Sequence, residues 1–171
     1  AGLTNRDQAK TFIYAFCYGA GAAKLGQIVG GNRAEGERLT KRFLDRMPVA
    51  LSTIRKQVLK TATGGRIKGL DGRTLIVRSP HTALNTIIQG AGASICKDWL
   101  VNMTQRINST GVDAKLVASI HDEYQFEVAK KDVQRFGTIT KEAIKDTEHT
   151  LNLRCPLDST WQDGETWAMT H

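Results

Sequence analysis

Four residues near the start of the chain combine cationic and aromatic side chains at a regular spacing. Arg6, Lys10, Tyr14 and Tyr18 follow one another at intervals of four residues. Each such step advances about 400° around an α-helix, so Arg6, Lys10 and Tyr14 project from one side of it. Two cations one turn apart near the positive N-terminus suit a phosphate chain, and the later rings could pack on a sugar or a base. The alternative is an amphipathic helix with a solvated basic edge and core-facing tyrosines.

A second candidate is the tripeptide His121-Asp122-Glu123, which lies between two β-rich runs at 116–120 and 124–128. Adjacent carboxylates on a regular strand point to opposite faces, whereas both can approach one site at a hairpin turn. Carboxylate oxygens are the ligands that Mg²⁺ prefers, although proteins rarely enclose this ion by themselves. The alternative is a solvated turn that happens to be charged. No nucleophile elbow accompanies the histidine, so the sequence does not indicate a serine or cysteine hydrolase.

A third group, the polar row, consists of Arg78, His81, Asn85 and Gln89, the last three spaced by four residues. Asn and Gln amides can donate to the purine N3 and pyrimidine O2 acceptors of a minor groove. Arg and His could contact phosphate or sugar. The small residues that follow, Gly90 to Ala93, leave space for something to approach closely. The alternative is a polar helix surface whose small residues pack on a neighbouring element.

Charge is distributed unevenly along the 171 residues, which are enough for one domain or two small ones. Residues 1–85 carry 15 Lys and Arg against 5 Asp and Glu, while residues 86–171 carry 9 against 12, within a net charge of +7. A basic half suggests a polyanionic partner, and the acidic half argues against a simple DNA-coating protein.

The cysteines and the hydropathy exclude other classes of protein. Three distant cysteines without a Cys-x-x-Cys pair favour free thiols over a disulfide framework or a structural zinc site. No apolar run approaches the roughly 18 residues that cross a bilayer, and the first residues lack a signal segment. We therefore expect a cytoplasmic protein without a membrane partner.

Capping residues and apolar periodicity predict an α+β fold. Thr4 or Asn5 is the expected cap of the first helix, and Pro48 is expected to open another. Helices are predicted over residues 6–18, 23–29, 34–47, 82–108 and 132–147, in addition to the one after Pro48. Strands are predicted at 66–68 and 74–77, around a turn at 70–72, and at 116–120 and 124–128.

Taken together, these pieces resemble the DNA polymerases of family A. The row at 6–19 resembles that family's O-helix motif, His121-Asp122-Glu123 its last palm motif, and Asn85-x-x-x-Gln89 its minor-groove helix. The intervening segments at 69–73 and 78–81 agree with the same order and spacing. The resemblance covers nearly the whole chain and is greatest to the replicative polymerases of podovirus bacteriophages. For a phage-encoded protein, it implies the cytoplasm of the bacterial host.

The resemblance implies a role for each residue of the first row. Arg6 and Lys10 would grip the triphosphate of an incoming deoxynucleoside triphosphate, with Lys10 a candidate general acid toward the leaving pyrophosphate. Tyr14 would lie at the sugar, and Tyr18 would stack near the templating position. These four residues are the expected nucleotide-binding residues.

The resemblance to family A also implies a metal-binding site and a DNA-binding site. Asp122 would hold a catalytic metal with Glu123 as a secondary carboxylate, while His121 would contact the primer terminus. The polar row would hold primer–template DNA near its end. The implied reaction is in-line attack of a primer 3′-hydroxyl on the α-phosphate, with two Mg²⁺ ions stabilising the attacking and leaving oxygens.

The chain departs from the family because it lacks one of the family's palm motifs. A complete enzyme has a second palm aspartate, within a motif resembling Asp-Tyr-Ser-x-Ile-Glu-Leu-Arg, and no such motif occurs here. We therefore expect a helical fingers subdomain at 1–64, with its nucleotide-binding helix at 4–19. This subdomain would be joined to a partial palm at 65–171, whose antiparallel hairpins pack on helices.

Our hypothesis is a C-terminal piece of a split polymerase, inactive alone. An N-terminal fragment carrying the thumb and the remaining palm would complete it. An excised domain of a longer enzyme has the same sequence signature. The alternative from another class is a non-catalytic DNA-binding accessory or remnant module with a polymerase-like fold.

Overall fold

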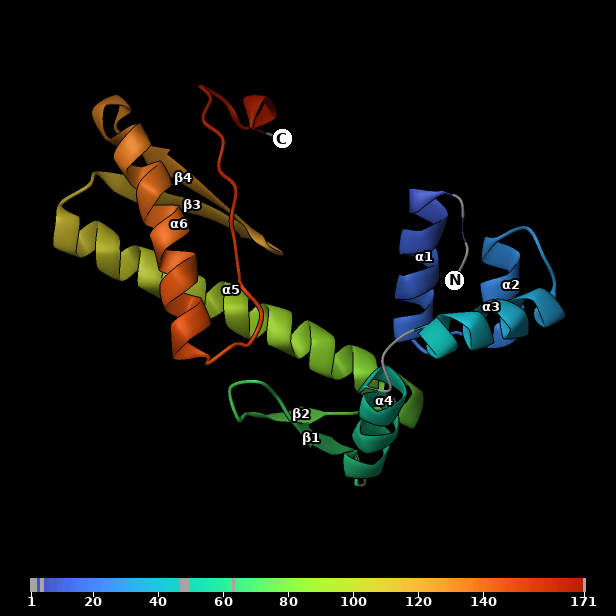
Figure 1. The fold of residues 1–171 in the computed structure, drawn as a ribbon. Helices are drawn as coiled ribbons and strands as arrows, with labels where there is room; N and C mark the ends of the chain where they lie inside the picture. Colours follow the sequence, from blue (N-terminus) through green and yellow to red (C-terminus); the bar gives the residue numbers. More distant parts are fainter. Residues whose placement is uncertain (1–2, 4, 47–49, 63, 171) are drawn as a thin grey trace. The chain divides into compact units, whose positions relative to one another are not determined.

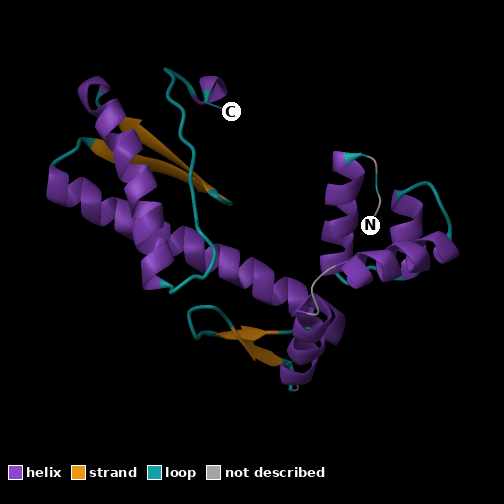
Figure 2. Ribbon diagram, viewed as in Figure 1, coloured by secondary structure: helices purple, strands orange, loops and turns teal. Residues whose placement is uncertain are grey.

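The computed structural model describes residues 3, 5–46, 50–62 and 64–170, with the side chains of residues 50–52, 55 and 81 outside the described part. It is a mixed structure of helices and two small sheets (Figures 1 and 2). The elements in chain order are α1 (Arg6–Cys17), α2 (Ala22–Ile28), α3 (Arg33–Arg46), α4 (Ala50–Thr61), β1 (Arg66–Lys68), β2 (Thr74–Ile76), η1 (Pro80–Thr82), α5 (Ala83–Thr110), β3 (Ala114–Ile120), β4 (Glu123–Val128), η2 (Lys130–Asp132), α6 (Val133–Thr150) and η3 (Trp167–Met169).

The predicted α+β class is confirmed. Strands β1 and β2 form one antiparallel pair and β3 and β4 another. The first three predicted helices match α1, α2 and α3 to within one residue at each end. Thr4 and Pro48, the expected cap and helix start, lie outside the described residues, and Asn5 caps α1.

Contacts divide the chain into two compact units, Ala1–Gly90 and Ala91–His171. The division falls within α5, which contributes to both units. Within the first unit, packing crosses the glycine pair at 64–65, because α4 shares a core with β1 and β2. The separation into fingers at 1–64 and palm at 65–171 stays a prediction.

Helix α1 is oriented by aromatic packing in the first unit. The Asn5 side chain accepts a hydrogen bond of 2.8 Å from the backbone N–H of Asp7, which satisfies a donor at the helix N-terminus. Phe12 and Phe16 are buried, and their ring centroids lie 5.7 and 5.2 Å from that of Phe43 in α3. Because the phenylalanines occupy one side of α1, its polar residues are left on the other side.

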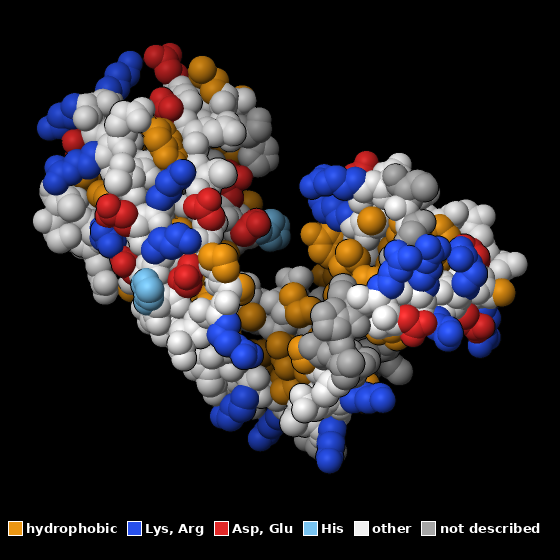
Figure 3. Space-filling model, viewed as in Figure 1, with side chains coloured by type: hydrophobic (Ala, Val, Ile, Leu, Met, Phe, Trp, Pro, Cys, Tyr) orange, Lys and Arg blue, Asp and Glu red, His pale blue; other side chains and the backbone are white. Residues whose placement is uncertain are grey.

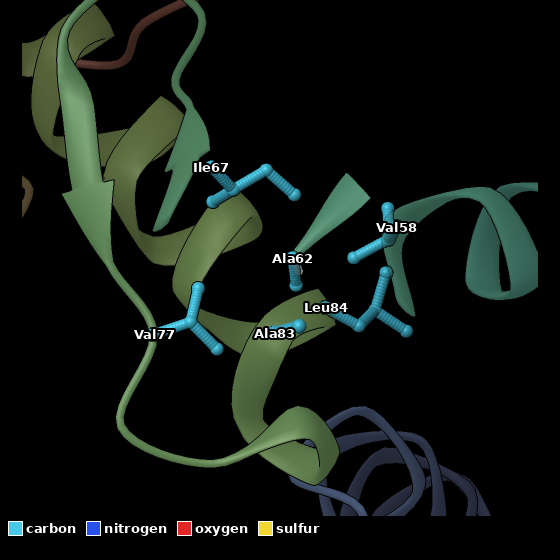
Figure 4. Packing of buried hydrophobic residues seen from close by; sticks show 6 residues of the cluster. All are labelled: Val58, Ala62, Ile67, Val77, Ala83 and Leu84. Atoms are coloured by element: carbon cyan, nitrogen blue, oxygen red, sulfur yellow. The ribbon is translucent and has the colours of Figure 1, made fainter. Parts of the chain in front are cut away.

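A second core in the first unit gathers α4, the first hairpin and the start of α5. The side chains of its six residues point toward one another in Figure 4: Val58, Ala62, Ile67, Val77, Ala83 and Leu84. Leu75 packs against this core from β2. A Cβ added at Gly90 would lie 2.7 Å from Cδ1 of Leu75, so glycine at this position lets the hairpin approach α5.

In the second unit, the β3–β4 hairpin packs on helices through an apolar cluster. Ile107 of α5, Val112 and Ile139 of α6 form its buried part. The ring of Phe126 in β4 lies 4.8 Å from that of Phe136 in α6. A two-stranded hairpin is marginal alone in water, so this burial holds the strands in place.

Polar contacts between α5 and α6 supplement the apolar cluster. Arg106 of α5 donates to both carboxylate oxygens of Asp146 in α6, at 2.6 and 3.1 Å, and also to Glu142. The indole N–H of Trp99 donates to the main-chain carbonyl of Thr140 at 2.9 Å. The hydrogen bond from Arg106 holds the pKa of Asp146 below its ordinary value.

The segment after α6 runs back along this helix (Figure 1). Glu148 accepts the backbone N–H of Leu157 at 2.8 Å, and Trp161 packs over Gly137. All three cysteines are free thiols, as expected. Among the described residues, no helix is both long enough and apolar enough to cross a bilayer.

Replacing Gly137 by Ala is expected to destabilise the second unit by about 1–3 kcal/mol, because the new Cβ would overlap Trp161. An ideal Cβ there lies 2.1 Å from ring atom Cε2. Urea unfolding followed by circular dichroism measures the loss, and a red shift of indole emission reports the displaced ring. The matched control is Gly92→Ala in α5, where a Cβ meets nothing within 4 Å. A stable Gly137→Ala variant would contradict this packing.

Asp146→Asn is expected to reduce the acid sensitivity of the protein. The Asp146 pKa lies below its ordinary value of 3.8 in the folded state, so its contribution is complete above that value. The contribution is lost as the pH falls through the lowered pKa. Solvent screening of the half-exposed pair limits it to about 0.5–1 kcal/mol.

Urea unfolding of wild type and Asp146→Asn at about pH 6 and about pH 3 measures this effect. The difference between the two proteins should shrink at the lower pH. Asp163→Asn, at an exposed position in the C-terminal segment, is the matched control. A difference that stays constant between the two pH values would count against the Arg106 contact as its cause.

Candidate active site

The first candidate surface is the exposed side of α1. Arg6 and Lys10 are exposed, and the side chains of Tyr14 and Tyr18 are each 55% exposed. The alternative interpretation of core-facing tyrosines is therefore wrong. The Lys10 ammonium lies 6.0 Å from the centroid of the Tyr14 ring, within range of a cation–π contact.

Tyr18 differs from the other three residues of the row in its backbone. Helix α1 ends at Cys17, and Tyr18 is the C-cap, with φ −75° and ψ 0°. Its backbone N–H still bonds to the carbonyl of Tyr14 at 2.9 Å. Lys and Arg side chains gather on the visible face of the α1–α3 region in Figure 3. The arrangement can offer cations to a phosphate chain and aromatic surface to a sugar or a base.

The second candidate lies at the tip of the β3–β4 hairpin. Ile120 pairs with Glu123, so the turn consists of His121 and Asp122 alone. His121 has a φ of 55°, in the left-handed region that a two-residue hairpin turn requires. Asp122 is exposed at the tip.

The two carboxylates therefore differ in environment. The sequence placed Glu123 in the turn, but the residue begins strand β4 and is half-buried. The side-chain amide of Gln125 donates to the Glu123 carboxylate. Burial raises the pKa of the Cys96 thiol, and the negative charge of Asp122 is the second cause of this increase. Asp122 remains open to solvent.

The carboxylates at this turn fit a divalent cation in part. An exposed carboxylate fits Mg²⁺, which keeps waters and commonly takes one or two protein carboxylates together with phosphates. Within the described residues, no group of three or more His, Cys, Asp or Glu side chains could hold a metal ion. The exposed Asp122 carboxylate therefore has the chemistry of one Mg²⁺ ligand, and the described residues do not by themselves supply a complete set.

The structure places two of the four residues of the polar row, Asn85 and Gln89, on one helix. Asn85 and Gln89 lie one turn apart in α5, half-buried and exposed respectively, and Arg78 is exposed just before η1. His81 was expected to share a helix with Asn85 and Gln89, but it lies in η1, because Pro80 opens a short 3-10 turn before α5 begins. The His81 side chain lies outside the described part of the chain. The space at Gly90 is occupied by Leu75, as the packing alternative predicts for that glycine.

One residue beside the turn was missed by the sequence analysis. The Tyr124 hydroxyl donates to the main-chain carbonyl of Cys96 in α5 at 2.7 Å. Its ring packs edge-on against Trp99, with centroids 5.4 Å apart. The available signal was a tyrosine directly after the acidic pair, at a strand position that alternation places on the same side as Phe126.

Comparison with known proteins identifies the family. The family model described as DNA polymerase family A matches residues 3–169. The chain belongs to this family. In Escherichia phage T7, a DNA-directed DNA polymerase is 38% identical over 193 residues, covering 100% of this chain and 27% of the relative. The DNA-directed DNA polymerase of Escherichia phage Phieco32 is 43% identical over 178 residues, covering 100% and 29%.

This family A chain spans less than a third of the length of those phage relatives. It therefore corresponds to one part of a family A DNA polymerase. A solved structure has a similar fold, with a TM-score of 0.76 at 24% identity over 83% of this chain and 27% of the other. That structure is the POL domain of Pol1 from M. smegmatis, in complex with DNA primer-template and dNTP.

The backbone at His121 generates a testable prediction. Replacing His121 by Val is expected to destabilise the fold by about 1–2 kcal/mol, because a β-branched residue at a φ of 55° is strained. His121→Asn is the matched control and should change stability by less than about 0.5 kcal/mol, since Asn tolerates this conformation. Urea unfolding measures both variants. Equal stabilities would argue against the left-handed turn.

Proposed function

We propose that the chain is the nucleotide-binding and metal-binding part of a DNA-directed DNA polymerase. It takes part in adding deoxynucleotides to a primer 3′-hydroxyl. The observation that carries this proposal is the exposed row on α1, in a chain that belongs to family A. A solvated helix side has no need for two cations and two aromatic rings in register, whereas a deoxynucleoside triphosphate paired with a templating base uses all of them.

Arg6 and Lys10 bind the triphosphate in this proposal. Both side chains are exposed in the first two turns of α1, where the helix dipole favours anions. Lys10 also donates a proton toward the leaving pyrophosphate. Its contact with Tyr14 keeps the ammonium beside the ring that packs on the sugar. Tyr18, at the helix end, stacks near the templating base.

Asp122 is the residue that holds a divalent cation, with Glu123 as a secondary carboxylate. Asp122 is exposed, while Glu123 is engaged by Gln125, which supports this ranking. When bound, two Mg²⁺ ions stabilise the attacking and leaving oxygens of the phosphoryl transfer. The second aspartate of such a site, absent from this sequence, lies outside the chain.

Arg78, His81, Asn85, Gln89 and His121 hold the primer–template in this proposal. Exposed Arg78 contacts phosphate, and the amides of Asn85 and Gln89 donate to minor-groove acceptors. His121, at the tip of the second hairpin, contacts the primer terminus. The thumb and the remaining palm come from an N-terminal fragment. Residues 1–64 act as fingers and 65–171 as part of the palm.

Reconstitution tests the proposal. Mixed with an N-terminal fragment that carries the thumb and the remaining palm, the chain should extend a primer in the presence of Mg²⁺, and neither part should do so alone. Asp122→Ala is expected to lower kcat/KM at least about 10³-fold, and Lys10→Ala about 10²–10³-fold, because each removes a group that acts on developing charge.

Lys24→Ala, an exposed lysine on α2 outside the proposed site, is the matched control and should retain full synthesis. Circular dichroism confirms that each variant is folded. DNA binding without any synthesis in the assembled wild type would support a non-catalytic remnant module. Primer extension by this chain alone, abolished by Asp122→Ala, would refute the need for a second part.

A further inference from the structure

The conformation of the acidic turn requires support from outside the hairpin. His121 adopts a φ of 55°, which is costly for a residue with a Cβ and is usually reserved for glycine. The pairing of Ile120 with Glu123 closes the turn, but a two-stranded hairpin is marginally stable alone. The end of the hairpin that carries Asp122 therefore requires a stabilising contact with another element.

Tyr124 provides a direct link from that end to a helix. It follows the turn by one residue, and its hydroxyl donates to the Cys96 carbonyl at 2.7 Å across 28 residues of sequence. Cys96 lies inside α5, where its carbonyl also accepts the helical bond of residue 100. A carbonyl oxygen has two lone pairs, so the phenol binds without unwinding the helix.

The link continues through the second unit. The Tyr124 ring packs edge-on at 5.4 Å from Trp99, whose indole N–H donates to the Thr140 carbonyl of α6 at 2.9 Å. Both helices beside the hairpin thus hold the strand that follows Asp122.

Asp122 stands two residues before Tyr124, and the pairing of Ile120 with Glu123 closes the turn between them. The phenol that bonds to α5 therefore restrains the turn that carries the carboxylate. We propose that the Tyr124 hydroxyl is a positioning group that fixes the Asp122 carboxylate for a divalent cation by tying the base of the turn to α5. This inference rests on the proposed polymerase function.

Tyr124→Phe tests the hydroxyl alone, because it keeps the ring that contacts Trp99. Hydrogen exchange of the amides at 120–124 should accelerate about tenfold, because one anchoring hydrogen bond is lost. The matched control is Thr104→Ala, which removes another hydroxyl that donates to a carbonyl of α5, that of Leu100, and takes no part in the contacts of Tyr124, Trp99 and Thr140. This control should leave exchange at 120–124 unchanged.

The assembled polymerase provides the second readout. Tyr124→Phe should raise the Mg²⁺ concentration for half-maximal primer extension about fivefold and lower kcat, while the KM for the deoxynucleotide stays unchanged. A merely structural role predicts loss of active protein without a shift in Mg²⁺ dependence.

The outcomes separate the two proposals. If amide hydrogen exchange at 120–124 is unchanged in Tyr124→Phe, the Tyr124 hydroxyl does not anchor the turn. An active assembly in which Tyr124→Phe has the Mg²⁺ dependence of wild type overturns its positioning role alone. A wild-type assembly that synthesises no DNA overturns the proposed function, and with it the catalytic consequence of the anchor.

Discussion

Burial of the β3–β4 hairpin against α5 and α6 is the constraint on which the acidic turn depends. An isolated pair of strands buries too little apolar surface to be stable in water. The hairpin is therefore stable because helices cover one of its faces. Phe126 meets Phe136 in an apolar cluster, and Arg106 ties α5 to α6 beside it. Asp122 is therefore placed by helix packing rather than by the turn alone.

The first unit applies the same principle to a helix. Phe12 and Phe16 bury one side of α1 against Phe43, which leaves the opposite side for chemistry. Because the cations and tyrosines on that side are exposed, a ligand can reach them. The first hairpin likewise depends on a helix, since Leu75 occupies the space beside Gly90.

Family membership and geometry establish different properties of this chain. The match over residues 3–169 identifies the chain as part of a family A DNA polymerase. The geometry then distinguishes residues that the motif treats alike. Asp122 and Glu123 are neighbours in sequence, yet one is exposed and the other is held by Gln125. That difference comes from a strand that begins one residue earlier than its sequence pattern suggests.

The α+β class, the first three helices and the face shared by Phe12 and Phe16 could all be predicted from the amino-acid sequence. These features follow from periodicity and capping, which act over a few residues. The exposure of Tyr14 and Tyr18, the packing of Leu75 beside Gly90 and the bond from Tyr124 to Cys96 could be read only from the folded chain. Such contacts join segments far apart in the chain, and their register depends on how whole elements pack, which no local pattern encodes.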